Sequence, residues 1–293
     1  MRLVSLSVAL SIVFLSAAAH AATWPAGAAF LGYAEERWSL WIVRPGEQKP
    51  TLISDVSEEP TDFAYSQAQA EVVYLDIQGR LWRLSLDSGT SQLLLESQDD
   101  AFAQPAYSEQ DNRIFLVRLK GGASEETSIV ALNSHGNPGF APVISQRSSQ
   151  FDPAHQGDLL YYAQVACVKD CGRIIQDIWR RNLASGRSEQ VTRVNAIAKE
   201  PTPSPDGRWI YFSSNKAGQY HLWRVSADGA EYQQLTEGNV ADTNPAVDKE
   251  GNVYFIRRSP LGTEVRRWSP NGIDQQIALP PGVSDIRSLK VAR

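Results

Sequence analysis

One pattern recurs along most of this chain: a short strand, a tight turn and a second short strand. The clearest copies are RLWRLSLDSGTSQLLL (80–95), DIWRRNLASGRSEQVT (177–192) and HLWRVSADGAEYQQLT (221–236), with weaker copies at 39–54, 128–143 and 264–279. The equivalent positions, 41 to 49 residues apart, are Trp41, Trp82, Val130, Trp179, Trp223 and Arg266. A fixed period of this length predicts a tandem-repeat fold.

A second motif repeats with the same period. EPTPSPDGRWIYF (200–212) matches QPAYSEQDNRIFLV (104–117) and NPAVDKEGNVYFI (244–256). Its Asp206-Gly207 turn, followed by aromatic and β-branched residues, favours a hairpin. Each repeat therefore contains four short strands, which is typical of a propeller blade.

The C-terminal segment completes the set. SDIRSLKVA (284–292) resembles TDFAYS (61–66), and the first repeat has no innermost strand of its own. We therefore predict an all-β, six-bladed β-propeller of four-stranded blades, closed by the C-terminal strand beside the N-terminal blade. Closure removes the open sheet edge. Residues 22–293 are expected to form a single domain.

The segment SPDGRWIYFSSNKAGQYHLWRVSADGAEYQQLT (204–236) resembles the repeat of TolB-like β-propellers, which is shared with the propellers of prolyl-oligopeptidase-type enzymes. The resemblance is strong over 200–258 and diffuse elsewhere. It implies a six-bladed propeller in a periplasmic protein of the cell envelope. TolB also carries an α/β domain before its propeller, for which this sequence has no room, so TolB activities that depend on that domain are not expected.

The first residues resemble a secretory leader. A short basic start, Met1-Arg2, precedes an apolar run from Leu3 to Ala18 and the small-x-small motif at residues 19–21. We predict a signal peptide over residues 1–21, a mature chain without a membrane span, and a location in the periplasm, with secretion as the alternative. The formal net charge of −5 gives no electrostatic support for binding nucleic acid.

The two cysteines lie close together in ACVKDCG. In an oxidising compartment, Cys167 and Cys171 are predicted to form a local disulfide. A metal pair is the alternative, although no second Cys or His pair completes a site.

Alternate loops of a propeller lie on opposite faces. The turns SPDG, ADG, DSG, ASG and PNG are short and alike, so we call their side the plain face. The other side, the variable face, carries the middle hairpin loops, of which 119–127 and 164–177 are the least regular. Irregular loops on a regular scaffold commonly carry binding sites, so the variable face is expected to hold the channel mouth and a partner.

The residue before the first-strand proline, or its equivalent, is an acid or an amide in every blade. These residues are Asp62, Gln104, Asp152, Glu200, Asn244 and Asp285. Six-fold closure would set them in a ring around the channel, where they could receive a partner's polar group or hold a cation such as calcium. They could also serve only to bind nearby backbone N–H groups. In TolB-like propellers the matching positions lie near the mouth where a partner docks, which implies the same role for Glu200 and its neighbours Lys199 and Thr202.

No catalytic motif is present: the chain has neither a G-x-S-x-G elbow nor H-E-x-x-H. His155, three residues after Asp152, could face the channel and join an acid–base pair, so we count it with the mouth residues. Trp82, Trp179 and Trp223 share one blade position and are expected to be core. Trp38, predicted in a loop of the variable face, could stack on a ligand.

We therefore expect a monomeric, non-enzymatic interaction module without a bound cofactor, docking an envelope protein or peptide at the channel mouth. A polysaccharide lyase or hydrolase, and a propeller that binds a glycan or small molecule, are the alternatives.

Overall fold

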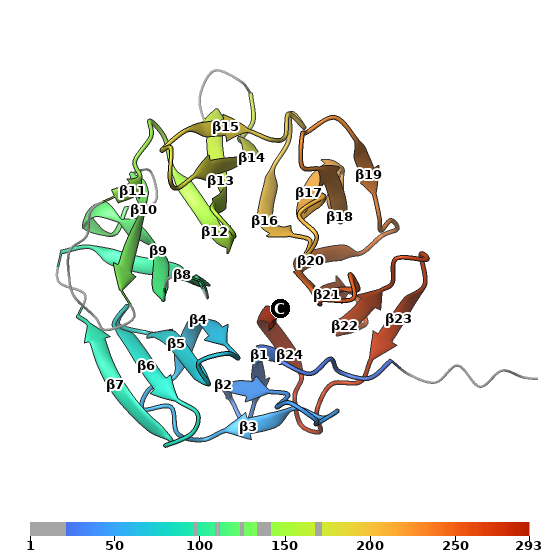
Figure 1. Ribbon diagram of the computed structural model, residues 1–293. Coiled ribbons are helices and arrows are strands. Elements are labelled where there is room, and N and C mark those ends of the chain that lie inside the picture. Colours follow the sequence, from blue (N-terminus) through green and yellow to red (C-terminus); the bar gives the residue numbers. More distant parts are fainter. Residues whose placement is uncertain are drawn as a thin grey trace, which may run out of the picture.

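The computed structural model describes residues 22–96, 99–108, 110, 112–123, 126–133, 142–167 and 172–292. These residues form a ring of six four-stranded antiparallel sheets around a central channel (Figure 1). The predicted fold class is confirmed. None of the described segments is a helix that is long and apolar enough to cross a bilayer.

Five blades take their strands from consecutive sequence. Blade 2 contains β4 (Pro60–Ser66), β5 (Glu71–Asp76), β6 (Leu81–Ser85) and β7 (Thr90–Leu95). Blade 3 contains β8 (Ala101–Ser108), β9 (Arg113–Leu119), β10 (Thr127–Asn133) and β11 (Pro142–Ile144), with the 3-10 turn η1 (Lys120–Gly122). Blade 4 contains β12 (Gln150–Gln156), β13 (Leu159–Cys167), β14 (Ile175–Asn182) and β15 (Ser188–Gln190).

Blade 5 contains β16 (Ala198–Pro203), β17 (Trp209–Ala217), β18 (Gln219–Ser226) and β19 (Tyr232–Gln234). Blade 6 contains β20 (Ala241–Val247), β21 (Val253–Ser259), β22 (Gly262–Trp268) and β23 (Asp274–Ile277). In each of these blades the first strand is innermost.

Blade 1 joins the two ends of the chain. Its order is β24 (Asp285–Val291), β1 (Ala28–Ala34), β2 (Arg37–Ile42) and β3 (Thr51–Ile53). The innermost strand therefore comes from the C-terminus, as the sequence predicts. β24 buries Ile286, Leu289 and Val291 in the core between blades 1 and 6.

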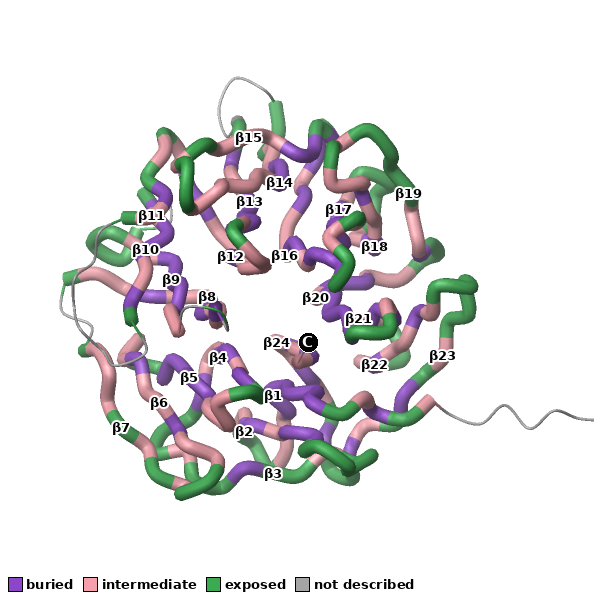
Figure 2. The backbone as a smooth tube through the Cα atoms, viewed as in Figure 1, coloured by how far each residue is buried: buried purple, intermediate pink, exposed green. Residues whose placement is uncertain are grey.

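The repeated third-strand position has an equivalent pairing partner in every blade. Each of its residues pairs with a fully buried residue of the second strand, as in Tyr74↔Trp82 and Phe212↔Trp223. The buried partners in chain order are Phe30, Tyr74, Leu116, Tyr162, Phe212 and Phe255. In blades 1 to 5 the third-strand residue packs into the core between neighbouring sheets, whereas Arg266 of blade 6 pairs with Glu264 and Asp274. Burial falls off toward the outer strands (Figure 2).

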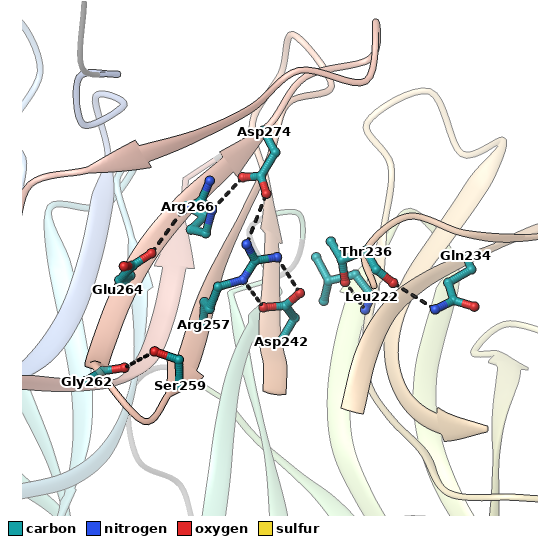
Figure 3. Close-up of polar contacts among 10 residues, drawn as sticks. All are labelled: Leu222, Gln234, Thr236, Asp242, Arg257, Ser259, Gly262, Glu264, Arg266 and Asp274. Carbon is teal, nitrogen blue, oxygen red and sulfur yellow. Dashed lines mark hydrogen bonds and ion pairs between the residues drawn. The ribbon is translucent and has the colours of Figure 1, made fainter. Parts of the chain in front are cut away.

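Blade 6 contains an ion-pair network around one buried carboxylate (Figure 3). The Asp242 carboxylate, whose side chain is fully buried, accepts two hydrogen bonds from Arg257, at 2.7 Å from Nε and 2.8 Å from Nη2. Asp274 lies 3.3 Å from Arg257 Nη1 and accepts a 2.7 Å bond from Arg266. These bonds raise the pKa of Arg257 above its ordinary value.

Candidate functional site: the central channel

The central channel of the described chain contains a cavity with a volume of about 630 Å³. At one end it is lined by a circle of six residues, one from each innermost strand, which we call the channel ring. Its members are Asp62, Gln104, Asp152, Glu200, Asn244 and Ser288. Five of them are the acid and amide residues that the sequence pattern identifies.

Five of the six ring residues share a backbone geometry. In Gln104, Asp152, Glu200, Asn244 and Ser288 the φ angle lies between 51° and 58°, the left-handed region that non-glycine residues seldom adopt. Each sits where the pairing register of the innermost strand shifts. Such bulges re-aim side chains, and in blades 3 to 6 the residue that follows is proline.

Side chains of the ring tie neighbouring blades together. Gln104 Oε1 accepts a 2.8 Å bond from Asp152 N–H, and Gln104 Nε2 donates to Asp152 Oδ1. Asp152 Oδ2 accepts from Glu200 N–H at 3.0 Å, and Glu200 Oε2 accepts from Asn244 N–H at 2.7 Å. The sequence left open that these residues only bind nearby backbone N–H groups. They do bind backbone N–H groups, but these groups belong to the next blade.

Asp152 is the most perturbed acid of the ring. Burial, together with the negative charge of Glu200, raises its pKa to about 6 despite the bond from Glu200 N–H. Lys199 binds Glu200 Oε1 at 3.0 Å, and its ammonium lies 4.8 Å from the centre of the Tyr220 ring.

The sequence also predicts Thr202, His155 and Lys199 as residues of the channel mouth. Thr202 lines the cavity but donates its hydroxyl to Pro245 O at 2.7 Å, which is a further tie between blades. His155 lines the cavity and stacks on Phe115, with 5.4 Å between ring centres. Lys199 precedes the ring position and is not part of the cavity wall.

The sequence alignment misplaces the sixth ring residue. Asp285 does not line the cavity; it accepts a 2.7 Å bond from Thr263 at the variable-face end of β22. The register shift of β24 falls between Arg287 and Lys290, which puts Ser288 in the ring. Matching Asp285 to the acids of the other blades places this segment three residues too early. The position of the backbone bulge gives the correct match, Ser288.

The channel also extends in the direction opposite to the predicted one. No lining residue precedes the ring position in any blade, whereas Gln110, Gly157 and Pro205 from the first turns of blades 3 to 5 do line the cavity. These turns belong to the plain face. The cavity therefore runs from the ring to the plain face, and the expectation of a mouth on the variable face is wrong for this cavity.

Beyond the ring, five of the six blades place a small side chain at the same position of the wall. Two residues after each ring position stand Ala64, Ala106, Ala154, Thr202, Ala246 and Lys290. Tyr65, Tyr107 and His155 line the wall one residue further along blades 2 to 4. The sequence reasoning missed Ser288 and Lys290, although Lys290 interrupts an otherwise small series once the repeats are aligned correctly.

Trp38 is not a free ligand platform. It lies in β2 and not in a loop, and its ring packs against Tyr33 at 5.3 Å. The guanidinium of Arg287 covers it, 4.0 Å from the ring centre. These contacts occupy the surface that a ligand would need.

Two other expectations concern residues that the structure does not describe. The predicted signal peptide and Cys171 lie outside the described residues, as does the side chain of Cys167. Among the side chains that are described, no three His, Cys, Asp or Glu residues come together in a metal-binding group.

The raised pKa of Asp152 predicts a pH-dependent stability. Because its folded pKa lies above the unfolded value of about 3.9, the native state holds the extra proton between about pH 4 and pH 6. The contribution of Asp152 to stability is therefore full below pH 4 and is lost as pH rises through 6, by up to about 3 kcal/mol. Urea unfolding at intervals from pH 4 to 7 measures it.

The readout is the difference in free energy of unfolding between the wild type and Asp152→Asn. The stability of the wild type relative to Asp152→Asn should decrease between pH 4 and 6 and then stay constant. Asp158→Asn, at an exposed position of the same blade, is the matched control. A difference that stays constant over this range would contradict the assignment.

The comparisons with known proteins agree on the fold. No protein-family model matches the chain. An uncharacterized protein of Agrobacterium fabrum is 36% identical over 81 residues, which is 27% of this chain and 28% of that protein. A structure assigned as TolB from Agrobacterium tumefaciens has a TM-score of 0.64 at 20% identity, covering 78% of this chain and 83% of that one.

Structures of lower sequence identity show the same fold. TolB from Acinetobacter baumannii has a TM-score of 0.73 at 16% identity, covering 90% of this chain and 66% of that one. A puromycin-hydrolyzing peptidase of Mycobacterium tuberculosis has a TM-score of 0.61 at 13% identity, and the match covers 88% of this chain but 46% of the peptidase. This chain therefore has the TolB-like six-bladed propeller fold.

Proposed function

We propose that this chain is an exported propeller that acts as a protein-docking module of the cell envelope, most simply in the periplasm. The observation that carries the proposal is the channel cavity of about 630 Å³, which is large enough to receive a side chain of a docking protein. The leader-like residues 1–21 and the resemblance to TolB-like propellers support the location.

The ring favours binding because it is preorganised. Gln104, Asp152 and Glu200 fix their neighbours through bonds between blades, so little freedom remains to be lost when a partner docks. Since the cavity meets the surface at the plain face, we place the partner there. The loops of the variable face are then outside the contact.

Site-specific photo-crosslinking in intact cells tests the proposal. A benzoylphenylalanine replaces exposed Gln110, which lines the cavity, or Ile273, a plain-face residue outside it that is 51% exposed. Leu261, which is 95% exposed on the variable face, is the third site. We expect a discrete protein adduct from position 110 and none from 261.

The control separates contact with the face from contact with the cavity. An adduct from 110 that exceeds the adduct from 273 places the partner over the channel. Adducts from 261 alone would refute docking on the plain face, and the absence of a protein adduct at all three positions would refute the docking role.

A further inference from the structure

The polar groups of the cavity are unevenly engaged. On the side of β8, β12 and β16, the side chains of Gln104, Asp152 and Glu200 each form hydrogen bonds to the next blade, either to a side chain or to a backbone N–H group. On the side of β20 and β24, the side chains of Asn244, Ser288 and Lys290 line the cavity, and none of them forms a hydrogen bond or ion pair within the described part of the chain. All three are half-buried.

These three side chains belong to neighbouring strands. β20 is the innermost strand of blade 6 and β24 that of blade 1, and the two strands pack against each other (Figure 1). Together they offer an ammonium, a hydroxyl and an amide. All three groups can donate hydrogen bonds, and a carboxylate only accepts them.

Lys290 is unusual among its equivalents. Four of the five matching wall positions hold alanine and the fifth holds Thr202, whose hydroxyl is already bonded to Pro245. The Lys290 ammonium forms no ion pair in the described part of the chain, although its charge acts on Asp152 and lowers the pKa of that acid. An incoming anion that contacts the ammonium directly would gain charge-assisted hydrogen bonds.

The rest of the wall limits the kind of anion. Asp62, Asp152 and Glu200 line the same cavity, and their negative charges repel a doubly charged group such as phosphate more strongly than a singly charged carboxylate. A carboxylate carries one negative charge, which matches the one positive charge of the Lys290 ammonium. His155 and Tyr107 stand on strands across the channel from β24 and β20, where they can contact the stem of the side chain that carries the carboxylate.

We propose that the cavity receives an acidic side chain, aspartate or glutamate, of a docking protein, inserted from the plain face with its carboxylate bound by Lys290, Ser288 and Asn244. This inference rests on the proposed docking function and names its recognition element. Uronic acid sugars carry the same carboxylate and serve as the competing occupant in the test.

The test uses the complete chain without an affinity tag, because Ala292 at the C-terminal end lines the cavity. An array of dodecapeptides is arranged in matched sets that differ only in Glu, Gln or Ala at one position. The protein is applied at low salt and detected with an antiserum. We expect Glu peptides to bind at least about tenfold more tightly than their Gln partners.

Two variants assign the effect. Lys290→Ala recreates the alanine of four other blades, so it should fold, and it should abolish the preference for Glu over Gln. Lys249→Ala removes an exposed lysine from a plain-face turn outside the cavity wall and should leave the preference unchanged.

Several results would overturn the inference. Equal binding of Glu and Gln peptides, a preference that survives Lys290→Ala, or no peptide binding would each exclude the acidic anchor. Binding of oligogalacturonate that depends on Lys290, without peptide binding, would assign the pocket to a sugar acid instead. An adduct from position 110 in the crosslinking experiment, combined with any of these results, would leave the docking function standing without this anchor.

Discussion

Asp242→Ala is expected to lower the free energy of unfolding by about 3–5 kcal/mol. The Asp242 side chain is fully buried and is the main partner of Arg257, whose own side chain is only 16% exposed. Its removal leaves the Arg257 charge in the blade with Asp274 at 3.3 Å as its remaining acidic partner (Figure 3). Urea unfolding followed by tryptophan fluorescence measures the loss.

Two controls show where that loss comes from. Asp274→Ala removes a carboxylate that is 30% exposed, and it should cost about 1 kcal/mol or less. The double variant Asp242→Leu/Arg257→Met removes both charges and should recover much of the stability. A value for Asp242→Ala within about 1 kcal/mol of wild type would show that water reaches Arg257.

Deletion of residues 285–293 is expected to abolish cooperative unfolding. The deletion removes β24, and with it the buried side chains of Ile286 and Leu289, which are 0% and 3% exposed. It also leaves β1 with an unpaired edge. Burial of each large aliphatic side chain contributes about 1.5–3 kcal/mol, so the summed loss rivals the whole stability of a typical domain.

Complementation distinguishes a missing strand from general damage. A synthetic peptide of residues 283–293 should restore the unfolding transition as its concentration rises, because it binds only the folded ring. The same peptide with Leu289→Asp should not restore it. A truncated chain that unfolds as cooperatively as the full chain would show that the ring does not need this closure.

The fold could be predicted because its evidence is repeated. Trp82, Trp179 and Trp223 stand at one position of a recurring unit, and errors in a single copy are corrected by the other copies. The closing strand followed from the same count, since one blade lacked its innermost member. These inferences needed only the periodicity of the chain and the requirement to pair sheet edges.

The candidate site was only partly predictable. The acid and amide pattern found five ring residues, and the side chains of three of them, Gln104, Asp152 and Glu200, bond to the next blade in a repeated way. Ser288 and Lys290 depend on a backbone bulge in β24, which leaves no mark in residue type. Arg287 covers Trp38, although the two residues lie near opposite ends of the sequence. No local sequence pattern predicts such a contact.

The shared first blade has a consequence for the order in which the protein forms. During synthesis β1 is among the first strands made, but its partner β24 is the last, so blades 2 to 6 can assemble before blade 1 is complete. Contacts between residues so far apart in sequence are slow to form. Until β24 pairs with it, the apolar edge of β1 stays available to other chains, and this interval is when the protein should be most prone to aggregate.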